Sequence, residues 1–255
     1  MNYKIVFFLC LQLSAGILGK KKRIVGGDNV HIRQIPYQVA LKNYTTNQLI
    51  GGGTIISASH VLTAAHCIYN KFLSDIRIYS GINSILSRKY ESRIIHVHIY
   101  EGFTGKEEDY GSYIHDIAVI FLDEPLELGT FRNKVNLPRR PAYVGQKGVV
   151  SGWGFTSYPS NALSATLQKA TMEVIDSDLC SDLLVINILD TQLCAFKRRG
   201  IGACRGDSGG PLISNGEIIG IASFVVPCAT GVPDVYTRVY EYNSFIMQVT
   251  GITID

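Results

Sequence analysis

The sequence predicts an all-β protein, built as a β-sandwich or as barrels. Beyond residue 24 the chain has many short runs rich in β-branched and aromatic residues, and turn residues divide them. Only one late stretch, residues 240–249, has the pattern of a helix. Of the 255 residues, 46% are hydrophobic and 18% are charged, which is ample apolar material for one or two domains. Short strands at this spacing favour a sandwich or barrels over a parallel α/β sheet.

The first segment resembles a secretory signal peptide. Lys4 precedes an apolar run at residues 5–13, and small residues follow at 14–16. A membrane span needs about 20 apolar residues, and Gln12 already interrupts this run. We therefore expect residues 1–16 to be a signal peptide, cleaved between 16 and 19, and the protein to be secreted without a membrane anchor.

The basic run at residues 20–23 is better explained as a protease cleavage site than as a basic patch. The formal net charge is +3, but five basic residues lie within the first 23 residues, where there are no acids. Without them, 19 basic residues stand against 21 acidic ones, which gives −2. A chain that starts at Ile24 has no basic excess to attract nucleic acid. Residues 17–23 are thus an expected propeptide.

The expected strands follow in order after residue 24. In the first half of the chain they are residues 37–42, 53–57, 76–79, 94–98 and 117–122. In the second half they are residues 148–152, 168–174, 211–213, 217–224 and 235–239. Residues 133–141 contain two prolines and three basic residues, so this segment is the expected linker between the halves. The helix at 240–249 then closes the chain.

Three short strings contain the residue types of a nucleophilic hydrolase. They are TAAHC with His66, HDIAVI with Asp116 and GDSGGP with Ser208. A serine hydroxyl needs a base to remove its proton, and a neutral imidazole suits that task near pH 7. A buried carboxylate can hold the imidazole tautomer and stabilise the cation that forms. Taken singly, each residue more often has a structural role: His66 in a core, Asp116 in a turn or cap, and Ser208 in a loop.

Taken together, these strings resemble those of the chymotrypsin-like serine peptidases. The matching strings are IVGG at 24–27, TAAHC at 63–67, DIAVI at 116–120, SGWG at 151–154, CRGDSGGP at 204–211 and PDVYTRV at 233–239. The resemblance implies a peptidase domain over residues 24–255, made of two packed six-stranded antiparallel Greek-key β-barrels with a C-terminal helix. It implies a secreted serine endopeptidase; the alternative is a catalytically silent homologue that acts as a binding or decoy protein.

The resemblance also implies a role for each residue of the three strings. His66 is the expected general base and then acid, Asp116 its orienting partner, and Ser208 the nucleophile. The backbone N–H groups of Gly206 and Ser208 are the expected oxyanion hole. Asp207 is expected to be buried and to pair with the new Ile24 amine, which cannot exist before a trypsin-like activator cuts after residue 23. The chain is therefore an expected zymogen, activated at Arg23.

The tripeptide Arg205-Gly206-Asp207 allows a different function, as an adhesion ligand for a cell-surface receptor. That function requires an exposed Asp207. The peptidase prediction instead requires a buried Asp207 with a cationic partner, because an isolated buried charge is very costly.

Five cysteines remain after Cys10 of the signal segment, and none forms a CxxC pair, so a zinc ribbon is not expected. In an oxidising compartment four of them form two bridges and one is left over. By resemblance the bridges are Cys180–Cys194 and Cys204–Cys228. Cys67 is the expected free thiol, since its usual partner is replaced by Gly51; it is either buried and inert or joined to another molecule. Asn43 opens a glycosylation sequon.

The expected primary specificity pocket departs from the trypsin pattern. Gly202 stands where trypsin-like members have a floor aspartate, and Asp234 stands where a wall glycine is usual. Val225, after Ser223 and Phe224, is expected to narrow the entrance as in elastase-like members. We predict a mixed or broad preference for the residue before the cleaved bond. The alternatives are an elastase-like or chymotrypsin-like preference and a preference for basic residues. Asp234 could also have no influence on specificity. Two further residues complete the expected pocket: Ala203 and Arg205.

We expect no cofactor and no metal. His96 and His98 share a face of an expected strand, but no third ligand is evident. Ile82 stands where the first glutamate of a calcium loop would be. The expected partners are protein or peptide substrates, the activating protease and protein inhibitors, with no nucleic acid, and the protein is expected to be a monomer.

Overall fold

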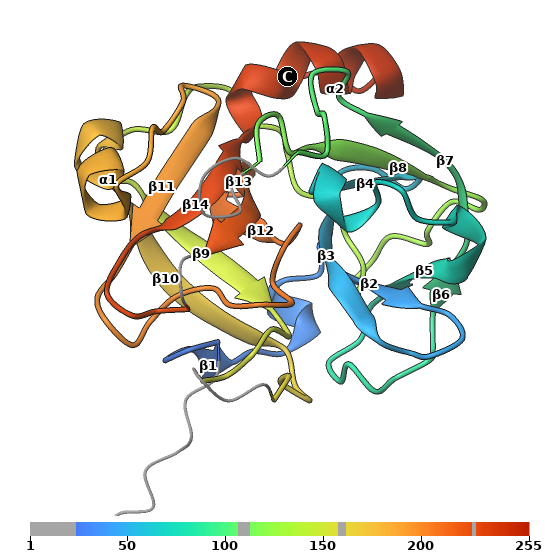
Figure 1. Ribbon diagram of the computed structural model, residues 1–255. Helices are drawn as coiled ribbons and strands as arrows, with labels where there is room; N and C mark the ends of the chain where they lie inside the picture. The colour runs from blue at the N-terminus through green and yellow to red at the C-terminus, as the bar shows by residue number, and fades with distance from the viewer. Residues whose placement is uncertain (1–23, 107–112, 158–161, 226–227, 255) are drawn as a thin grey trace, which may run out of the picture.

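The computed structural model describes residues 24–106, 113–157, 162–225 and 228–254 and shows two β-barrels packed side by side (Figure 1). This confirms the predicted fold class. The expected signal peptide and propeptide, with Arg23, lie outside the described residues. No helix in the described ranges is long and apolar enough to cross a membrane.

The N-terminal barrel is an antiparallel sheet in the order β6-β5-β2-β3-β4-β8-β7. Six of its strands form the wall, and β6, of two residues, extends the β5 edge. Their bounds are β2 (Gln38–Asn43), β3 (Leu49–Ile55), β4 (His60–Thr63), β5 (Ile76–Ser80), β6 (Glu91–Ser92), β7 (Ile94–Ile99) and β8 (Ala118–Leu122). Short 3₁₀ turns η1 (Ile32–Gln34), η2 (Ala65–Cys67) and η3 (Leu73–Asp75) lie between strands.

The C-terminal barrel closes on itself, because β9 pairs with both β10 and β12. Its order is β10-β11-β14-β13-β12-β9, and the short β1 adds to β10. The bounds are β1 (Asp28–Asn29), β9 (Lys147–Gly152), β10 (Gln168–Val174), β11 (Gln192–Phe196), β12 (Pro211–Ser214), β13 (Glu217–Val225) and β14 (Asp234–Arg238). Each barrel therefore has the six-stranded wall that the resemblance implies.

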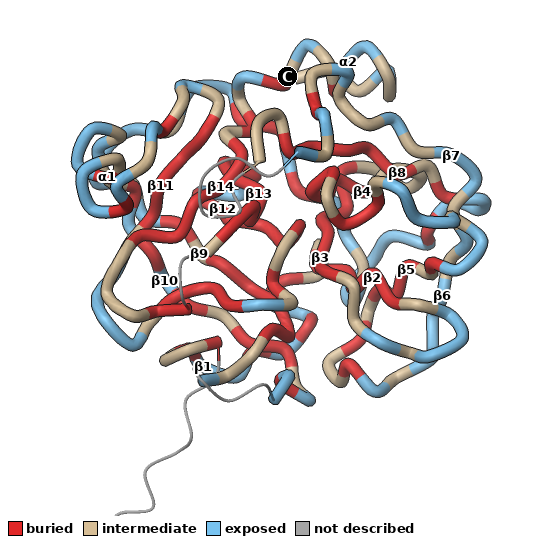
Figure 2. The backbone as a smooth tube through the Cα atoms, viewed as in Figure 1, coloured by how far each residue is buried: buried red, intermediate tan, exposed pale blue. Residues whose placement is uncertain are grey.

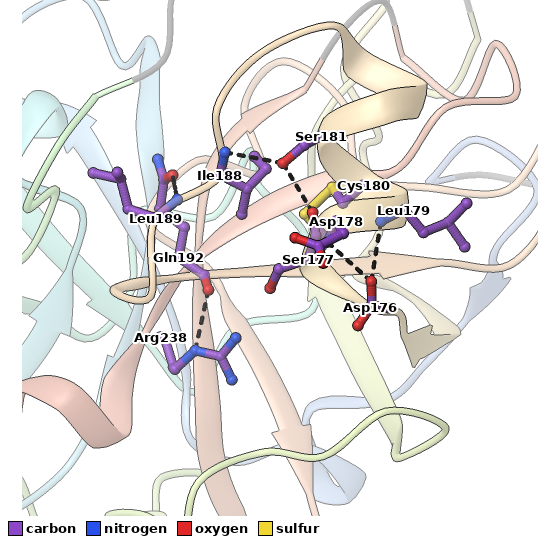
Figure 3. Close-up of a disulfide and its surroundings, with 11 residues drawn as sticks. Asp176, Ser177, Asp178, Leu179, Cys180, Ser181, Ile188, Leu189, Gln192 and Arg238 are labelled. Atoms are coloured by element: carbon purple, nitrogen blue, oxygen red, sulfur yellow. Dashed lines mark hydrogen bonds between the residues drawn. A yellow bond between two sulfur atoms is a disulfide. The ribbon is translucent and has the colours of Figure 1, made fainter.

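Four described strands and one helix were not among the expected elements: β1, β4, β6, β11 and α1 (Ser177–Leu184). The α1 helix begins at Asp176, whose side chain accepts hydrogen bonds from the Asp178 and Leu179 N–H groups (Figure 3). A disulfide from Cys180 ties this helix to β11. The expected helix at 240–249 is present but divided into the 3₁₀ turn η5 (Val239–Tyr242) and α2 (Asn243–Thr250).

Buried residues follow the strands of both barrels (Figure 2). The largest apolar cluster includes β-strands of the N-terminal barrel together with Ile213, Ile221 and Ile246 of the other half. The segment 133–141 crosses between the barrels: the Val135 N–H donates to Ile55, and the Asn136 N–H donates to Gly216. The two barrels thus share apolar packing and backbone hydrogen bonds along their junction, which holds the loops there in fixed positions.

Candidate active site

Strand pairing brings His66 and Asp116 together. His66 lies in η2 directly after β4, and Asp116 lies two residues before β8. Because β4 and β8 are antiparallel neighbours, with Thr63 opposite Ala118, the residues that flank these positions meet at the same end of the barrel. The short β4, which the sequence analysis missed, is therefore the element that positions the histidine.

Asp116 accepts three hydrogen bonds with its carboxylate. His66 donates from its backbone N–H to Oδ1 at 2.9 Å, and its Nδ1 lies 2.7 Å from Oδ2. Ser223 Oγ, from the C-terminal barrel, donates to Oδ2 at 2.6 Å. Thr237 Oγ1 donates to the Asp116 carbonyl at 2.7 Å. A buried carboxylate held this way makes Nδ1 the protonated nitrogen of His66 and leaves Nε2 as the basic one.

The surroundings of His66 favour its charged form. Burial lowers the pKa of His66, but the Cys67 sulfur and the Asp116 carboxylate raise it by more, so that the pKa lies well above the ordinary value. Asp116 is the cause with a clear physical basis, because its side chain is fully buried and bonded to the imidazole. An imidazolium that forms here is thus stabilised by its partner.

Tyr113 stacks on the imidazole of His66, with ring centroids 5.1 Å apart and planes at 10°. The Tyr113 ring also lies 5.7 Å from that of Phe103, and its carbonyl accepts a hydrogen bond from Gln192 of β11. Tyr113 was not among the expected site residues, although it lies only three positions before Asp116. Stacking on Tyr113 restrains the plane of the His66 ring and covers one of its faces.

Ser208 lies in the loop before β12, and Cys67 contacts both Ser208 and His66. The Cys67 sulfur lies 3.6 Å from His66 Nε2 and 3.6 Å from the Ser208 carbonyl oxygen, so the two residues are neighbours. The Gly52 N–H donates to that carbonyl at 2.7 Å and anchors the loop to β3. No hydrogen bond joins Ser208 Oγ to His66 among the described residues. In substrate-free sites such bonds are often long and tighten on binding.

Two backbone N–H groups beside Ser208 have no protein acceptor in the described part of the chain: those of Gly206 and Ser208. Gly206 has a φ of +98°, which strongly favours glycine, and a Cβ there would lie 3.0 Å from Leu163 and 3.1 Å from Gly154. Both residues are partly accessible. Free N–H groups in such a loop can stabilise a negative charge that develops during a reaction.

Asp207 is buried at 1% exposure. Its carboxylate accepts hydrogen bonds from the backbone N–H groups of Gly154 at 2.8 Å and Cys204 at 3.0 Å. No cation pairs with it among the described residues. Burial raises the pKa of Asp207 to about 6, although the two N–H groups oppose the shift. The buried side chain excludes the adhesion-ligand hypothesis, which needs an exposed aspartate.

The Ile24 side chain is fully buried in the core of the C-terminal barrel. Val25 forms an isolated antiparallel bridge with Gly202, whose N–H donates to the Val25 carbonyl at 3.1 Å. The segment that follows the basic run is therefore packed against the segment that leads to Cys204 and Asp207.

Asp234 and Gly202 are in direct contact. Asp234 is 3% exposed, and its Oδ2 accepts a hydrogen bond from the Ala203 N–H at 2.7 Å. A Cβ on Gly202 would lie 2.9 Å from Oδ2, so a floor side chain would displace this carboxyl. Burial raises the pKa of Asp234 to about 8; Asp207 adds to the shift, while the Ala203 N–H and the Tyr236 hydroxyl oppose it. Asp234 is therefore mainly protonated at neutral pH.

The remaining expected pocket residues lie around this pair. Ser223 and Phe224 are buried, and Val225 is half-buried and pairs with Asp234 across β13 and β14. Arg205 is exposed, and its carbonyl accepts a hydrogen bond from the Phe155 N–H. Residues 226–227, which follow Val225, lie outside the described ranges.

Within the described ranges two disulfides are present, Cys180–Cys194 and Cys204–Cys228, and Cys67 is a buried free thiol. A Cβ on Gly51 would lie 2.7 Å from the Cys67 sulfur, which shows how closely the thiol packs on β3.

Two other predicted positions lie away from these groups. Asn43, at the end of β2, is partly exposed, and its side-chain oxygen accepts hydrogen bonds from Thr46. In the segment that begins at Ile82, the buried Lys42 ammonium donates to the carbonyls of Ile85 at 2.9 Å and Ser87 at 2.7 Å. In this segment, where a calcium loop was considered, the two carbonyls are thus bound by the Lys42 ammonium.

Comparisons with known proteins find similar sequences and a similar fold. A sequence model of the trypsin family matches residues 24–246. Chymotrypsin-2 of Vespa crabro is 34% identical over 88% of this chain and 99% of its own length. Trypsin zeta of Drosophila erecta is 35% identical over 85% of this chain and 82% of its own. The structure of neuropsin, a serine protease expressed in the limbic system of mouse brain, superimposes with a TM-score of 0.79 at 30% identity, over 88% of this chain and 98% of that chain.

Proposed function

Since this chain belongs to the trypsin family and is a chymotrypsin-like serine endopeptidase, we propose that it cleaves peptide bonds with Ser208, His66 and Asp116. The main support for these roles is the hydrogen bond between Asp116 and His66. Ser223 of the C-terminal barrel also bonds Asp116, and Cys67, which follows His66, contacts Ser208. The decoy alternative is not favoured, because all three side chains are present and grouped at the barrel junction.

The proposed reaction uses the basic Nε2 of His66. Nε2 accepts the proton of Ser208 Oγ while Oγ attacks the substrate carbonyl carbon, and the carbonyl oxygen becomes an oxyanion. The free N–H groups of Gly206 and Ser208 stabilise that charge; losing one such donor typically costs about 3 kcal/mol of transition-state stabilisation. The imidazolium, stabilised by Asp116, then protonates the leaving amine, and an acyl-enzyme forms. Water then takes the place of the amine: it attacks the acyl carbon while His66 accepts its proton, and His66 returns that proton to Ser208 Oγ as the acid is released.

We further propose that the chain is a zymogen activated by cleavage of the Arg23–Ile24 bond. A fully buried carboxylate without a cation is costly, and no cation of the described part of the chain pairs with the buried Asp207. Cleavage creates an amine on Ile24, whose side chain already lies in the adjacent core. Pairing of this amine with Asp207 would stabilise the loop that carries Gly206 and Ser208.

The neutral floor at Gly202 and the mainly protonated Asp234 support mixed or broad preference for the residue before the cleaved bond. Aliphatic and aromatic side chains suit a neutral pocket, and the ionised fraction of Asp234 would accept basic ones. The apolar run at residues 5–13 and the two disulfides support secretion into an oxidising environment.

Activation of the full precursor tests this function. The precursor is treated with trypsin immobilised on beads, the beads are removed, and hydrolysis of a mixed peptide library is followed by mass spectrometry. We expect a new N-terminus at Ile24 and library cleavage that is absent from Ser208→Ala and from Arg23→Gln, which resists the activator. A correctly processed chain that cleaves nothing would instead support a binding protein.

A further inference from the structure

Two histidines on the outer barrel wall lie as close together as the ligands of one metal ion. His96 and His98 stand on β7, the edge strand of the N-terminal sheet, at the right-hand side of Figure 1. Alternation along the strand puts both side chains on one face. Their ring centroids are 4.4 Å apart, with the planes at 79°. The sequence predicts the shared face but not this separation.

The imidazole nitrogens of both residues are available to a ligand. Both side chains are exposed, and neither ring makes a hydrogen bond with another described residue. Unpaired imidazole nitrogens at the surface are the ordinary ligands of late transition metals.

Packing limits the freedom of the two rings before any metal binds. Phe121 of β8 lies beneath both, with ring centroids 5.7 Å from His96 and 5.4 Å from His98. A register shift between Ile94 and His96 marks a β-bulge immediately before the pair, and bulges re-aim the side chains that follow. Held rings lose less conformational entropy on binding than free ones.

His60 contacts the same Phe121 ring at 4.6 Å but does not join the pair. Its Nδ1 lies 2.7 Å from Ser57 Oγ, with which it hydrogen-bonds. No group of three histidine, cysteine or carboxylate side chains in the described ranges is placed to hold one ion. A metal on β7 would therefore have two protein ligands, with water at the other positions.

The separation of the rings favours right-angled coordination. With metal–nitrogen bonds of about 2.0–2.1 Å and ring centres roughly 1.1 Å beyond, ring centroids lie about 4.5 Å apart at 90° and about 5.2 Å apart at a tetrahedral angle. With one nitrogen of each ring turned toward the same ion, the observed 4.4 Å corresponds to the right angle. Tetragonal geometry with nitrogen and oxygen ligands is typical of Cu²⁺ and Ni²⁺, and Cu²⁺ binds most tightly among the divalent first-row ions.

From this geometry we propose that His96 and His98 form a surface site for Cu²⁺, separate from the catalytic residues. The site takes Cu²⁺ in preference to Zn²⁺, and binding stabilises the folded chain because the unfolded chain does not hold the two rings together.

Cu²⁺ titration of the activated chain carrying Ser208→Ala, which prevents self-digestion, tests the proposal. Calorimetry and electron paramagnetic resonance should show one Cu²⁺ per chain with nitrogen ligation, an increased melting temperature, and weaker binding of Zn²⁺. His96→Gln and His98→Gln should each weaken Cu²⁺ binding at least tenfold. His60→Gln is the matched control on the same Phe121 ring and should bind as before.

Circular dichroism verifies that each variant is folded. The proposal is wrong if both single variants retain the affinity, if no Cu²⁺ binds at micromolar concentration, or if the signal is lost only in a His66→Ala variant.

Discussion

The protonation of Asp234 should make the choice of substrate depend on pH. The pKa of this buried carboxyl is raised to about 8. From that value roughly one tenth of the molecules carry the charge at pH 7 and about nine tenths at pH 9. If only the ionised form attracts a basic side chain, the ratio of kcat/KM for an arginyl over a leucyl substrate rises about tenfold between these pH values.

The ratio of the two kcat/KM values reports the ionisation of Asp234 and not that of other titrating groups. Protonation of His66 and loss of the Ile24 amine change kcat/KM for both substrates alike, so they cancel. kcat/KM reports the free enzyme, so the guanidinium of a bound substrate does not distort the observed pKa. The assay is initial-rate hydrolysis of two matched peptides that differ only in the arginine or leucine before the cleaved bond.

Asp234→Asn is the control, because its side-chain oxygen can still accept from the Ala203 N–H. This variant should show a ratio that is low and independent of pH. The reasoning is refuted if the ratio of the unaltered enzyme is flat from pH 7 to 9, or if the Asn variant keeps the same rise.

Other residues give further predictions. Asp116→Asn should lower kcat by about 10⁴ with little change in urea stability, since it disturbs the tautomer of His66 and not the fold; an unchanged kcat would contradict the assigned role. Lys42→Met should destabilise the chain by about 1.5–3 kcal/mol in urea unfolding, because it removes hydrogen bonds from a charged donor; full stability would contradict this. Activity should fall reversibly at alkaline pH. The Ile24 amine, with an ordinary pKa of about 8 that pairing with Asp207 raises, is charged below its raised pKa and loses its proton above it; a rate that is constant to pH 11 would argue against the pair.

Local sequence strings were sufficient to predict the fold class and to select the residues that meet at the junction. Periodicity located most strands, such as the one at residues 168–174, which matches β10 residue for residue. It failed for β4, which has only four residues. It also failed for α1, although Asp176 is a residue type that often caps the start of a helix.

Contacts between distant segments could not be read from the sequence. Tyr113 and Thr237 act on His66 and Asp116 only because the barrels place them there. The raised pKa of Asp234 likewise depends on burial, which the sequence string PDVY does not reveal. The expected signal peptide and the Arg23 cleavage site lie outside the described residues and stay predictions.

Site-specific labelling tests the central claim most directly. The processed chain is incubated with a phosphonylating reagent that reacts with activated serines, and the adduct is mapped by peptide mass spectrometry. We predict a single adduct on Ser208, with labelling strongly reduced in His66→Ala and in the unprocessed precursor. A processed, folded chain that takes up no label, or that carries the label on another serine, would contradict the assignment of Ser208 as the nucleophile.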